Sequence, residues 1–479
     1  MTTEQEAQVL AMLTAYQNGV KMSDLPELGS DVNPFNLITE VIYNGESRRA
    51  QLAAMLPYLE ETCAYGAEWD NTQETTACTR VGNLALHVTL PIQSRMRGCL
   101  LNDDGSVREY LDPMDWRTGV RDGSRGMVMV ELPDHYERFI TNYNKQRVMM
   151  SEYPLPGYIH IPKCYVSAYQ ATIDRTDSSK PKLASVVNTT AAFRGGNNNS
   201  DYDGKSNSFL GVPASDTSRT AFRNYARNRN NGDTQWNEMV YDVQKELYWL
   251  YVVEYANRSC QLGFNSALTT EGYHQGGLGN GVSDIDWNKW GTFNGQRPFI
   301  PCGYTDQFGN FSGVKDFTMP TEYDSTNTKV TSVPRYRGVE NPFAHIWQWA
   351  DGINVEVNPG DTGVSRVFIC SDPAKFSDTG YDGYRLAGNE ARKEGYVKNI
   401  LFGAYGDIDA SEVGAGNTTH FGDYHYTNIP STTTLRGVVF GGGARNGAEC
   451  GFVYSGSDDV PSAAWATVGS RLCYIPKVA

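Results

Sequence analysis

The stretch of sequence most informative about the fold is residues 441–469, GGGARNGAECGFVYSGSDDVPSAAWATVG. It mixes small and short polar residues with isolated aromatics, a composition that a buried strand would not tolerate. Runs typical of strands flank it at residues 435–440 and 471–475. We therefore expect an exposed segment between two strands. Aromatic contact area beside adaptable polar side chains is typical of a binding surface, and an ordinary long surface loop is the alternative.

A buried helix is expected upstream of this stretch, at residues 240–256, VYDVQKELYWLYVVEYA. Val243, Leu247 and Leu250 follow a helical spacing, and Trp249 adds an apolar group on another side. Apolar groups on most faces are typical of a helix that lies within a domain core.

Two tryptophans lie close together in HIWQWADG, residues 345–352. In an extended segment Trp347 and Trp349 point to the same face, because side chains alternate along a strand. Two large rings on one face favour a core wedge. Their indole N–H groups need partners when they are buried.

The whole composition indicates turns and short strands rather than a helical bundle. The 479 residues include 48 glycines, 21 prolines and 29 tyrosines, and 40% are hydrophobic, enough for real cores. Further strands are expected at residues 127–132, 157–166, 366–370 and 399–402, and residues 195–208 are expected to form an exposed loop.

The charge excludes some classes of partner. The chain has 41 basic and 55 acidic residues, a formal net charge of −14. Nucleic-acid binding is not expected, because a phosphate backbone needs clustered cations. No run of about 18 apolar residues occurs, so no membrane insertion is expected. The first residues lack the pattern of a secretory signal, which favours the cytoplasm or a route without a signal, such as packaging into a virus particle.

Residues 1–62 are expected to form a separate N-terminal region. A capping-box pattern and a helical spacing predict a helix at residues 3–19. Residues 36–43 are typical of a strand that the Asn44-Gly45 turn closes, and residues 46–61 of a second short helix. Such small elements cannot bury much surface alone. Attachment or oligomerisation is one interpretation, and simple packing onto the rest of the chain is the other.

Motifs for cofactor or metal chemistry are weak. Residues 276–281, GGLGNG, lack the Lys-Ser/Thr of a P-loop, and Asp284 and Asp286 lack the spacing of an EF-hand. The seven histidines show no HExxH spacing, and the nine cysteines form no C-x-x-C pair. The cysteines are therefore expected to be small buried hydrophobes. No cofactor is expected, and metal binding stays open.

Three segments resemble the formylglycine-generating-enzyme branch of the C-type lectin fold. Residues 345–352 resemble its W-E-W-type motif, residues 242–261 its long central helix, and residues 435–475 its closing segment. More narrowly, the closing segment resembles the variable region of diversity-generating-retroelement target proteins, as found in phages and bacteria of the gut Bacteroides group. Residues 121–139, RDGSRGMVMVELPDHYERF, also resemble phage tail proteins of this lectin type.

The resemblance implies an α+β fold with a C-type-lectin-like (formylglycine-generating-enzyme-like) domain that has long loops. This ligand-binding domain would span residues 157–479, with a variable region at about 441–471. A β-rich intermediate region at residues 63–156 and a small N-terminal helix and strand attachment region at residues 1–62 would precede it.

The resemblance also divides the closing segment into scaffold and ligand-facing positions. The implied scaffold is Gly441, Gly442, Asn446, Gly447, Gly451, Phe452, Pro461, Ser462, Gly469, Ser470 and Arg471. The implied diversified positions, which would contact ligand, are Gly443, Arg445, Glu449, Tyr454, Ser455, Ser457, Asp458, Asp459, Ala463, Trp465 and Thr467.

The implied function is that of a non-enzymatic receptor-binding adhesin of a phage tail. Such a protein would be a homotrimer on the virion, bind a bacterial surface protein or glycan, and contact other tail proteins through its N-terminal region. The bacterial cytoplasm or cell surface is the alternative location. Two other functions stay open: a formylglycine-generating-type cysteine oxidase that uses Cys450 and Cys473, and a purely structural virion protein.

Overall fold

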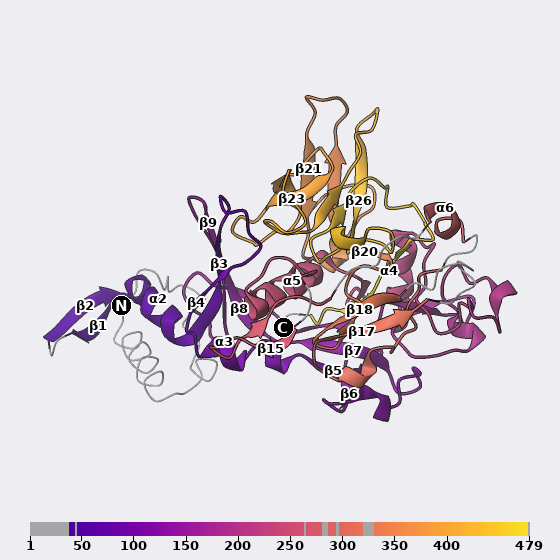
Figure 1. The fold of residues 1–479 in the computed structure, drawn as a ribbon, viewed down its shortest axis with the longest axis horizontal. Helices are drawn as coiled ribbons and strands as arrows, with labels where there is room; N and C mark the ends of the chain where they lie inside the picture. The colour runs from indigo at the N-terminus through magenta and orange to yellow at the C-terminus, as the bar shows by residue number, and fades with distance from the viewer. Residues whose placement is uncertain are drawn as a thin grey trace.

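The computed structural model describes residues 38–43, 46–262, 265–279, 286–293, 297–319 and 330–477. Many short strands form several sheets around a few helices, as Figure 1 shows. This mixed architecture confirms the α+β part of the expected fold. Within the described residues no helix is long and apolar enough to cross a membrane.

A five-stranded sheet follows the N-terminal elements. Its strands, in the order β10-β8-β9-β3-β4, are Ile159–Ile161 (β10), His135–Asn142 (β8), Lys145–Ser151 (β9), Ala64–Asp70 (β3) and Thr79–Gly82 (β4). Helix α2, Leu52–Cys63, leads into β3 and packs Leu56 and Leu59 against Met149 of β9.

The N-terminal region departs from the expected pattern. The helix expected at residues 46–61 is wrong in its first part, because Glu46–Gln51 is strand β2, which pairs with Ile38–Tyr43, strand β1. The segment ESRRAQ therefore finds backbone partners on β1, and tertiary pairing overrides its helical preference. The helix expected at residues 3–19 lies outside the described residues. In Figure 1 the β1–β2 hairpin lies at one end of the molecule.

A six-stranded sheet joins distant parts of the chain. Its strands, in the order β14-β29-β11-β7-β5-β6, are Trp236–Glu238 (β14), Leu472–Tyr474 (β29), Cys164–Ser167 (β11), Met127–Leu132 (β7), Arg97–Leu101 (β5) and Val107–Tyr110 (β6). β7 matches the strand expected at residues 127–132. Because β11 pairs with both β7 and β29, this sheet crosses the domain boundary expected at residues 156/157.

The single strand expected at residues 157–166 is wrong, because two strands lie there. β10 belongs to the five-stranded sheet and β11 to the six-stranded sheet. Pro162 stands between them, and proline lacks the N–H group that a continuous ladder needs. The chain changes sheets at this position.

The largest sheet is built from the last third of the chain. Eight of its strands, in order across the sheet, are Arg385–Asn389 (β22), Ser365–Ile369 (β21), Trp347–Val357 (β20), Thr434–Phe440 (β26), Ser455–Gly456 (β27), Tyr424–Tyr426 (β25), Gly395–Ile400 (β23) and Ala410–Val413 (β24). The ninth strand, Val468–Gly469 (β28), pairs in parallel with β20. β26 confirms the strand expected at residues 435–440, and β21 overlaps the one expected at 366–370. The strand expected at 399–402 is only the end of β23.

Helix α5, Tyr241–Tyr255, crosses the middle of the molecule (Figure 1). Every residue in it except Asp242 is buried. Trp249 stacks on Trp69 of β3, with 5.8 Å between ring centroids, and its Nε1 donates to the carbonyl of Gly406 at 2.7 Å. The expected buried helix is confirmed, and it joins the five-stranded sheet to the C-terminal part of the chain.

Smaller elements complete the fold. They are α3 Leu86–Thr89, α4 Arg219–Arg227, α6 Trp287–Trp290, the pairs β12 Thr172–Asp174 with β13 Lys182–Ala184 and β15 Asn265–Leu268 with β16 His274–Gln275, and the three-stranded sheet of β17 Gly313–Thr318, β18 Val330–Tyr336 and β19 Val339–Glu340. Residues 195–208 carry one short 3₁₀ turn and no strand, as expected for a loop.

Arg471 ties the closing segment to the body of the protein. This side chain is 1% exposed, and its guanidinium donates to the carbonyl of Ser167 at 3.1 Å and to that of Asn341 at 2.7 Å. Its Nε donates to Oε1 of Gln348 at 2.6 Å. The segment that starts at β26 in the largest sheet therefore ends firmly in the six-stranded sheet.

Candidate functional site

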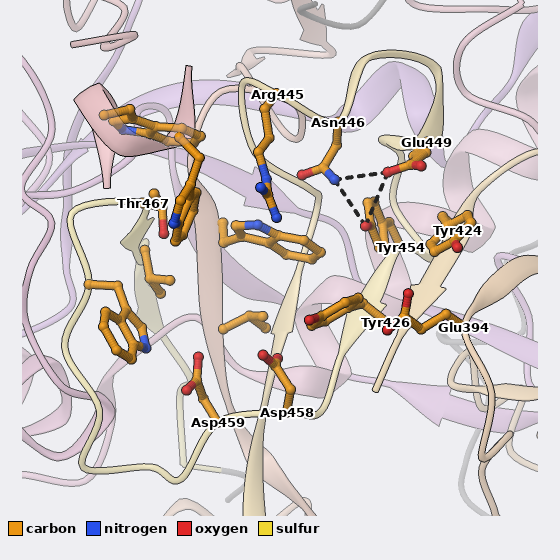
Figure 2. A pocket seen from close by; sticks show the side chains of 16 residues that line it. Glu394, Tyr424, Tyr426, Arg445, Asn446, Glu449, Tyr454, Asp458, Asp459 and Thr467 are labelled. Atoms are coloured by element: carbon orange, nitrogen blue, oxygen red, sulfur yellow. Dashed lines mark hydrogen bonds between the residues drawn. The ribbon is translucent and has the colours of Figure 1, made fainter. Parts of the chain in front are cut away.

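The segment between β26 and β29 forms part of the wall of a cavity of about 480 Å³ (Figure 2). The lining side chains are mostly aromatic or acidic. They are Trp287, Trp290, Trp347, Glu394, Tyr424, Tyr426, Val439, Arg445, Asn446, Glu449, Tyr454, Asp458, Asp459, Trp465, Thr467 and Val468.

Seven of the eleven expected ligand-facing residues meet in this cavity. They are Arg445, Glu449, Tyr454, Asp458, Asp459, Trp465 and Thr467. Figure 2 shows Arg445 entering the cavity from one side and the carboxylates of Asp458 and Asp459 from the opposite side. The fold thus converts a linear run of sequence into opposed walls.

The expected contacts Ser455 and Ser457 lie elsewhere. Both are fully buried. The hydroxyl of Ser455 lies 2.9 Å from Nδ1 of His425, and that of Ser457 donates to Oε1 of Glu390 at 2.7 Å. Both serines face away from the cavity into buried polar clusters, because β27 and the residue after it pair inside the sheet.

Gly443 and Ala463 are also outside the cavity lining. A Cβ atom on Gly443 would lie 2.8 Å from the ring of Trp290 and 3.1 Å from that of Trp347. A side chain there would displace two rings that line the cavity. Ala463 is half-buried and packs against the cluster that contains Trp349. The absence of a side chain at Gly443 therefore leaves room for both rings.

Several cavity residues were not expected from the sequence. Trp287 and Trp290 come from α6, Tyr424 and Tyr426 from β25, and Glu394 from the turn before β23. These segments all lie outside the closing segment, and α6 lies far from it in sequence. The tryptophans of α6 are close together in WNKW, and that pair of rings is the signal that could have indicated a surface of this kind.

The two tryptophans of β20 have different roles. Trp349 is fully buried, as expected for a core wedge. Trp347 is half-buried: it packs against the same buried cluster and also lines the cavity, so the core interpretation holds only in part for this ring. Its ring meets that of Tyr454 edge to face, with 4.4 Å between centroids. Both rings lie on one face of the strand, and Trp347 is the ring at its end.

The aromatic rings that line the cavity contact one another. Tyr454 also meets Tyr424 edge to face at 5.7 Å between centroids, and Trp287 meets Trp290 at 6.2 Å. The guanidinium carbon of Arg445 lies 4.5 Å from the centroid of the Trp287 ring, a cation–π contact. Such contacts limit the freedom of these side chains before any ligand binds.

A hydrogen-bonded triad fixes one corner of the cavity (Figure 2). Nδ2 of Asn446 donates to Oε2 of Glu449 at 2.8 Å and to the hydroxyl of Tyr454 at 3.1 Å. Oδ1 of Asn446 accepts from the N–H of Gly443 at 3.0 Å. Burial raises the pKa of the Tyr454 hydroxyl, so this group stays neutral. Asn446, expected as scaffold, is both scaffold and lining.

The opposite wall is acidic. Burial, helped by the neighbouring charge of Asp459, raises the pKa of Asp458 to about 6. Burial also raises the pKa of Asp459, and a hydrogen bond from Trp465 opposes that rise. With Glu394 and Glu449, four carboxyl groups line the cavity beside one guanidinium, that of Arg445. A ligand that brings hydrogen-bond donors or positive charge would meet complementary groups.

The cysteines lack the surroundings of a redox centre. Sγ of Cys450 lies 3.5 Å from the carbonyl oxygen of Gly443, whereas Sγ of Cys473 lies 3.8 Å from Sδ of Met239. Burial raises the pKa of both thiols, that of Cys473 to about 12. A reactive cysteine needs a lowered pKa and access to solvent. All nine cysteines are free and eight are buried, as expected for small hydrophobes.

Metal-type ligands converge at one place among the described residues. His135, Glu137 and Glu246 bring three ligand atoms within 4.8 Å of one another, and none of the three lines the cavity. Of the two carboxylates considered for calcium, Asp284 lies outside the described residues, and Oδ1 of Asp286 accepts from the N–H of Asn288 at 2.9 Å at the start of α6.

A scan of the sequence against protein-family models finds no match, and a search of the curated proteins finds no relative.

Proposed function

We propose that this protein is a receptor-binding adhesin whose aromatic and acidic cavity binds a ligand on a bacterial surface. The supporting observation is the convergence of seven expected ligand-facing side chains with rings from α6, β20 and β25 in one cavity. Large rigid aromatic rings increase the contact area of a binding surface, so the many rings of this cavity favour ligand recognition.

The cavity suits recognition in physical terms. Tryptophan and tyrosine offer large contact areas and lose little conformational entropy when they bind. Trp287 and Trp465 are 39% and 44% exposed, so both offer ring surface to a ligand. The four carboxyl groups accept hydrogen bonds from hydroxyl or amino groups. This chemistry fits a glycan ring or a basic side chain of a surface protein, and it disfavours strongly anionic glycans.

The proposed scaffold is a C-type-lectin-like domain of the formylglycine-generating-enzyme branch, with a diversified closing segment. The central helix α5, the two tryptophans of β20 and the return of the closing segment beside β20 as β28 support it. Backbone glycines with positive φ, such as Gly441 at 99° and Gly442 at 80°, fix the path of the segment. Exposed neighbours such as Arg445 are then free to vary.

The proposed location is a phage tail, with the N-terminal region as the attachment point and a homotrimer as the assembly. In Figure 1 the β1–β2 hairpin lies at the end of the molecule away from α6, one wall of the cavity. This arrangement suits a protein fixed at one end that presents ligand at the other. Three linked cavities would strengthen weak single-site binding through avidity.

The test is adsorption of the purified, fluorescently labelled protein to a panel of bacterial cells. Two cavity variants, Trp465→Ala and Arg445→Ala, are compared with wild type on the strains that bind. We expect each to lose roughly tenfold or more in affinity, because a central aromatic or arginine contact contributes about 2 kcal/mol. Soluble neutral, amino and sulfated glycans, added as competitors, report the ligand class.

The matched control is Tyr143→Ala, which removes a ring that is 96% exposed in the turn between β8 and β9. This variant should adsorb as wild type does. Equal adsorption of wild type and both cavity variants would contradict the proposal. Particles that fail to assemble with the cavity variants would favour the purely structural virion role instead.

A further inference from the structure

A second site lies between strand β8 and helix α5. Nε2 of His135 lies 3.1 Å from Oε1 of Glu246 and 3.5 Å from Oε1 of Glu137. The three ligand atoms lie within 4.8 Å of one another. His135 and Glu137 are two residues apart on β8, so both side chains point to the same face of the strand, where they meet Glu246 of α5.

These atoms converge without hydrogen-bond geometry. Among the described residues, Nε2 of His135, both carboxylate oxygens of Glu137 and Oε1 of Glu246 have no hydrogen-bond partner. The three side chains are at most 4% exposed. Buried polar atoms without partners are rare and costly, so four at one point need a physical cause.

The other nitrogen of His135 fixes the state of the ring. Nδ1 lies 2.9 Å from the carbonyl oxygen of Pro133, which can only accept a hydrogen bond. Nδ1 therefore carries a proton and donates it. When the ring is neutral, the lone pair of Nε2 is available to bind a cation, the arrangement that metal-binding histidines adopt.

The two carboxyl groups of the site need a compensating positive charge. Two buried carboxyl groups face a histidine, and the neighbouring ammonium of Lys245 already binds Oδ1 of Asp242 at 3.2 Å. A buried pair of carboxylates without a compensating cation is strongly disfavoured. A divalent cation would balance both carboxylates while the imidazole stays neutral.

We propose that His135, Glu137 and Glu246 bind a divalent transition-metal ion, with zinc as the best match. Zinc binds imidazole nitrogen and carboxylate oxygen at about 2.0–2.2 Å, so two ligand atoms around a tetrahedral ion lie about 3.4 Å apart. The two separations from Nε2 agree with this value. Imidazole together with carboxylate selects zinc, iron or manganese over calcium.

The ion would join the five-stranded sheet to the central helix. β8 belongs to that sheet, and α5 packs against both β3 and β9 of it. Three ligands from two elements would fix how the sheet sits on the helix. The site is separate from the ligand-binding cavity, so it is independent of the proposed adhesin function.

The first experiment measures metal content by mass spectrometry in purified full-length protein. We expect about one zinc ion for each chain, because a buried site binds metal as the chain folds. His135→Gln and Glu137→Gln should lose most of it. Glu238→Gln is the matched control, because Glu238 in β14 is also a buried strand carboxyl whose oxygens have no hydrogen-bond partner in the described part of the chain. This variant should keep the metal.

The second experiment does not depend on how well the variants fold. Wild-type protein is unfolded with a chelator and refolded without metal, with zinc or with manganese. We expect a higher Tm with zinc, which increases with its concentration. Metal-free wild-type protein whose Tm does not respond to either ion would overturn the proposal. It would indicate a protonated histidine between the two glutamates, as would unchanged metal content in the His135 and Glu137 variants.

Discussion

At the scale of single residues, neighbours in the closing segment have opposite surroundings. Ser457 is fully buried against Glu390, whereas Asp458, the next residue, lines the cavity. The resemblance of the closing segment implied ligand contact for both. Only the pairing of this stretch inside the sheet decides which of them faces the cavity, and this pairing depends on β25, a strand from another segment.

The raised pKa of Asp458 predicts a pH-dependent affinity. With a pKa of about 6, this carboxyl group is mostly ionised at pH 7 and mostly protonated at pH 5. A ligand that donates hydrogen bonds or carries positive charge prefers the ionised form. We expect affinity to fall by up to about tenfold from pH 7 to pH 5, measured by adsorption or calorimetry at each pH.

The variant Asp458→Asn provides the control for this titration. Its affinity should vary less with pH, and a wild-type profile in this variant would contradict the assignment. The effect on stability has the opposite sign. The folded pKa is above the value of about 3.9 in unfolded chains, so this group favours the folded state below pH 4 and loses that contribution as pH rises to about 6.

At the scale of elements, the predictable pieces were those whose pattern is local. α5 and β7 carry dense apolar runs, and each lies where the sequence placed it. The helix expected over residues 46–51 is wrong, because the pairing of this segment with β1 cannot be read from its own residues. Only part of the cavity lining can be predicted from the sequence, for the same reason. Its closing-segment wall lies in one run of sequence, whereas α6 and β25 reach it only through the fold.

Because α5 connects the five-stranded sheet to the C-terminal part of the chain, we expect substitution of Trp249 to lower the free energy of unfolding strongly. Trp249→Ala would remove a ring that stacks on Trp69 and lies 5.5 Å from the ring of Phe402, measured between centroids. It would also remove the hydrogen bond from Nε1 to the carbonyl of Gly406. We expect a loss of about 3–5 kcal/mol in the free energy of unfolding, measured by denaturant titration. The exposed Trp465→Ala should change it by only about 0.5 kcal/mol. Similar losses in both would refute this role for α5.

At the scale of the whole molecule, the hairpin and the cavity wall α6 lie toward opposite ends (Figure 1). Removal of residues 1–51 should leave ligand binding within about twofold of wild type, because the contacts of the cavity are made elsewhere. The same deletion should prevent incorporation into particles. Adsorption of the truncated protein and its presence in purified particles are the two measurements. Loss of adsorption by a folded truncated protein would contradict the separation of roles.

Strand β29 lies between β14 and β11 in the six-stranded sheet. Arg471, just before it, donates to the carbonyl of Ser167, 304 residues earlier in the chain. This sheet can therefore form completely only after residues 472–474 have been synthesised. Until then, the edge of β11 that pairs with β29 has no partner strand. An exposed strand edge favours association with other chains until β29 pairs with it. In return, a chain cut short before β29 cannot complete this sheet, so a prematurely terminated product would expose the edges of β14 and β11.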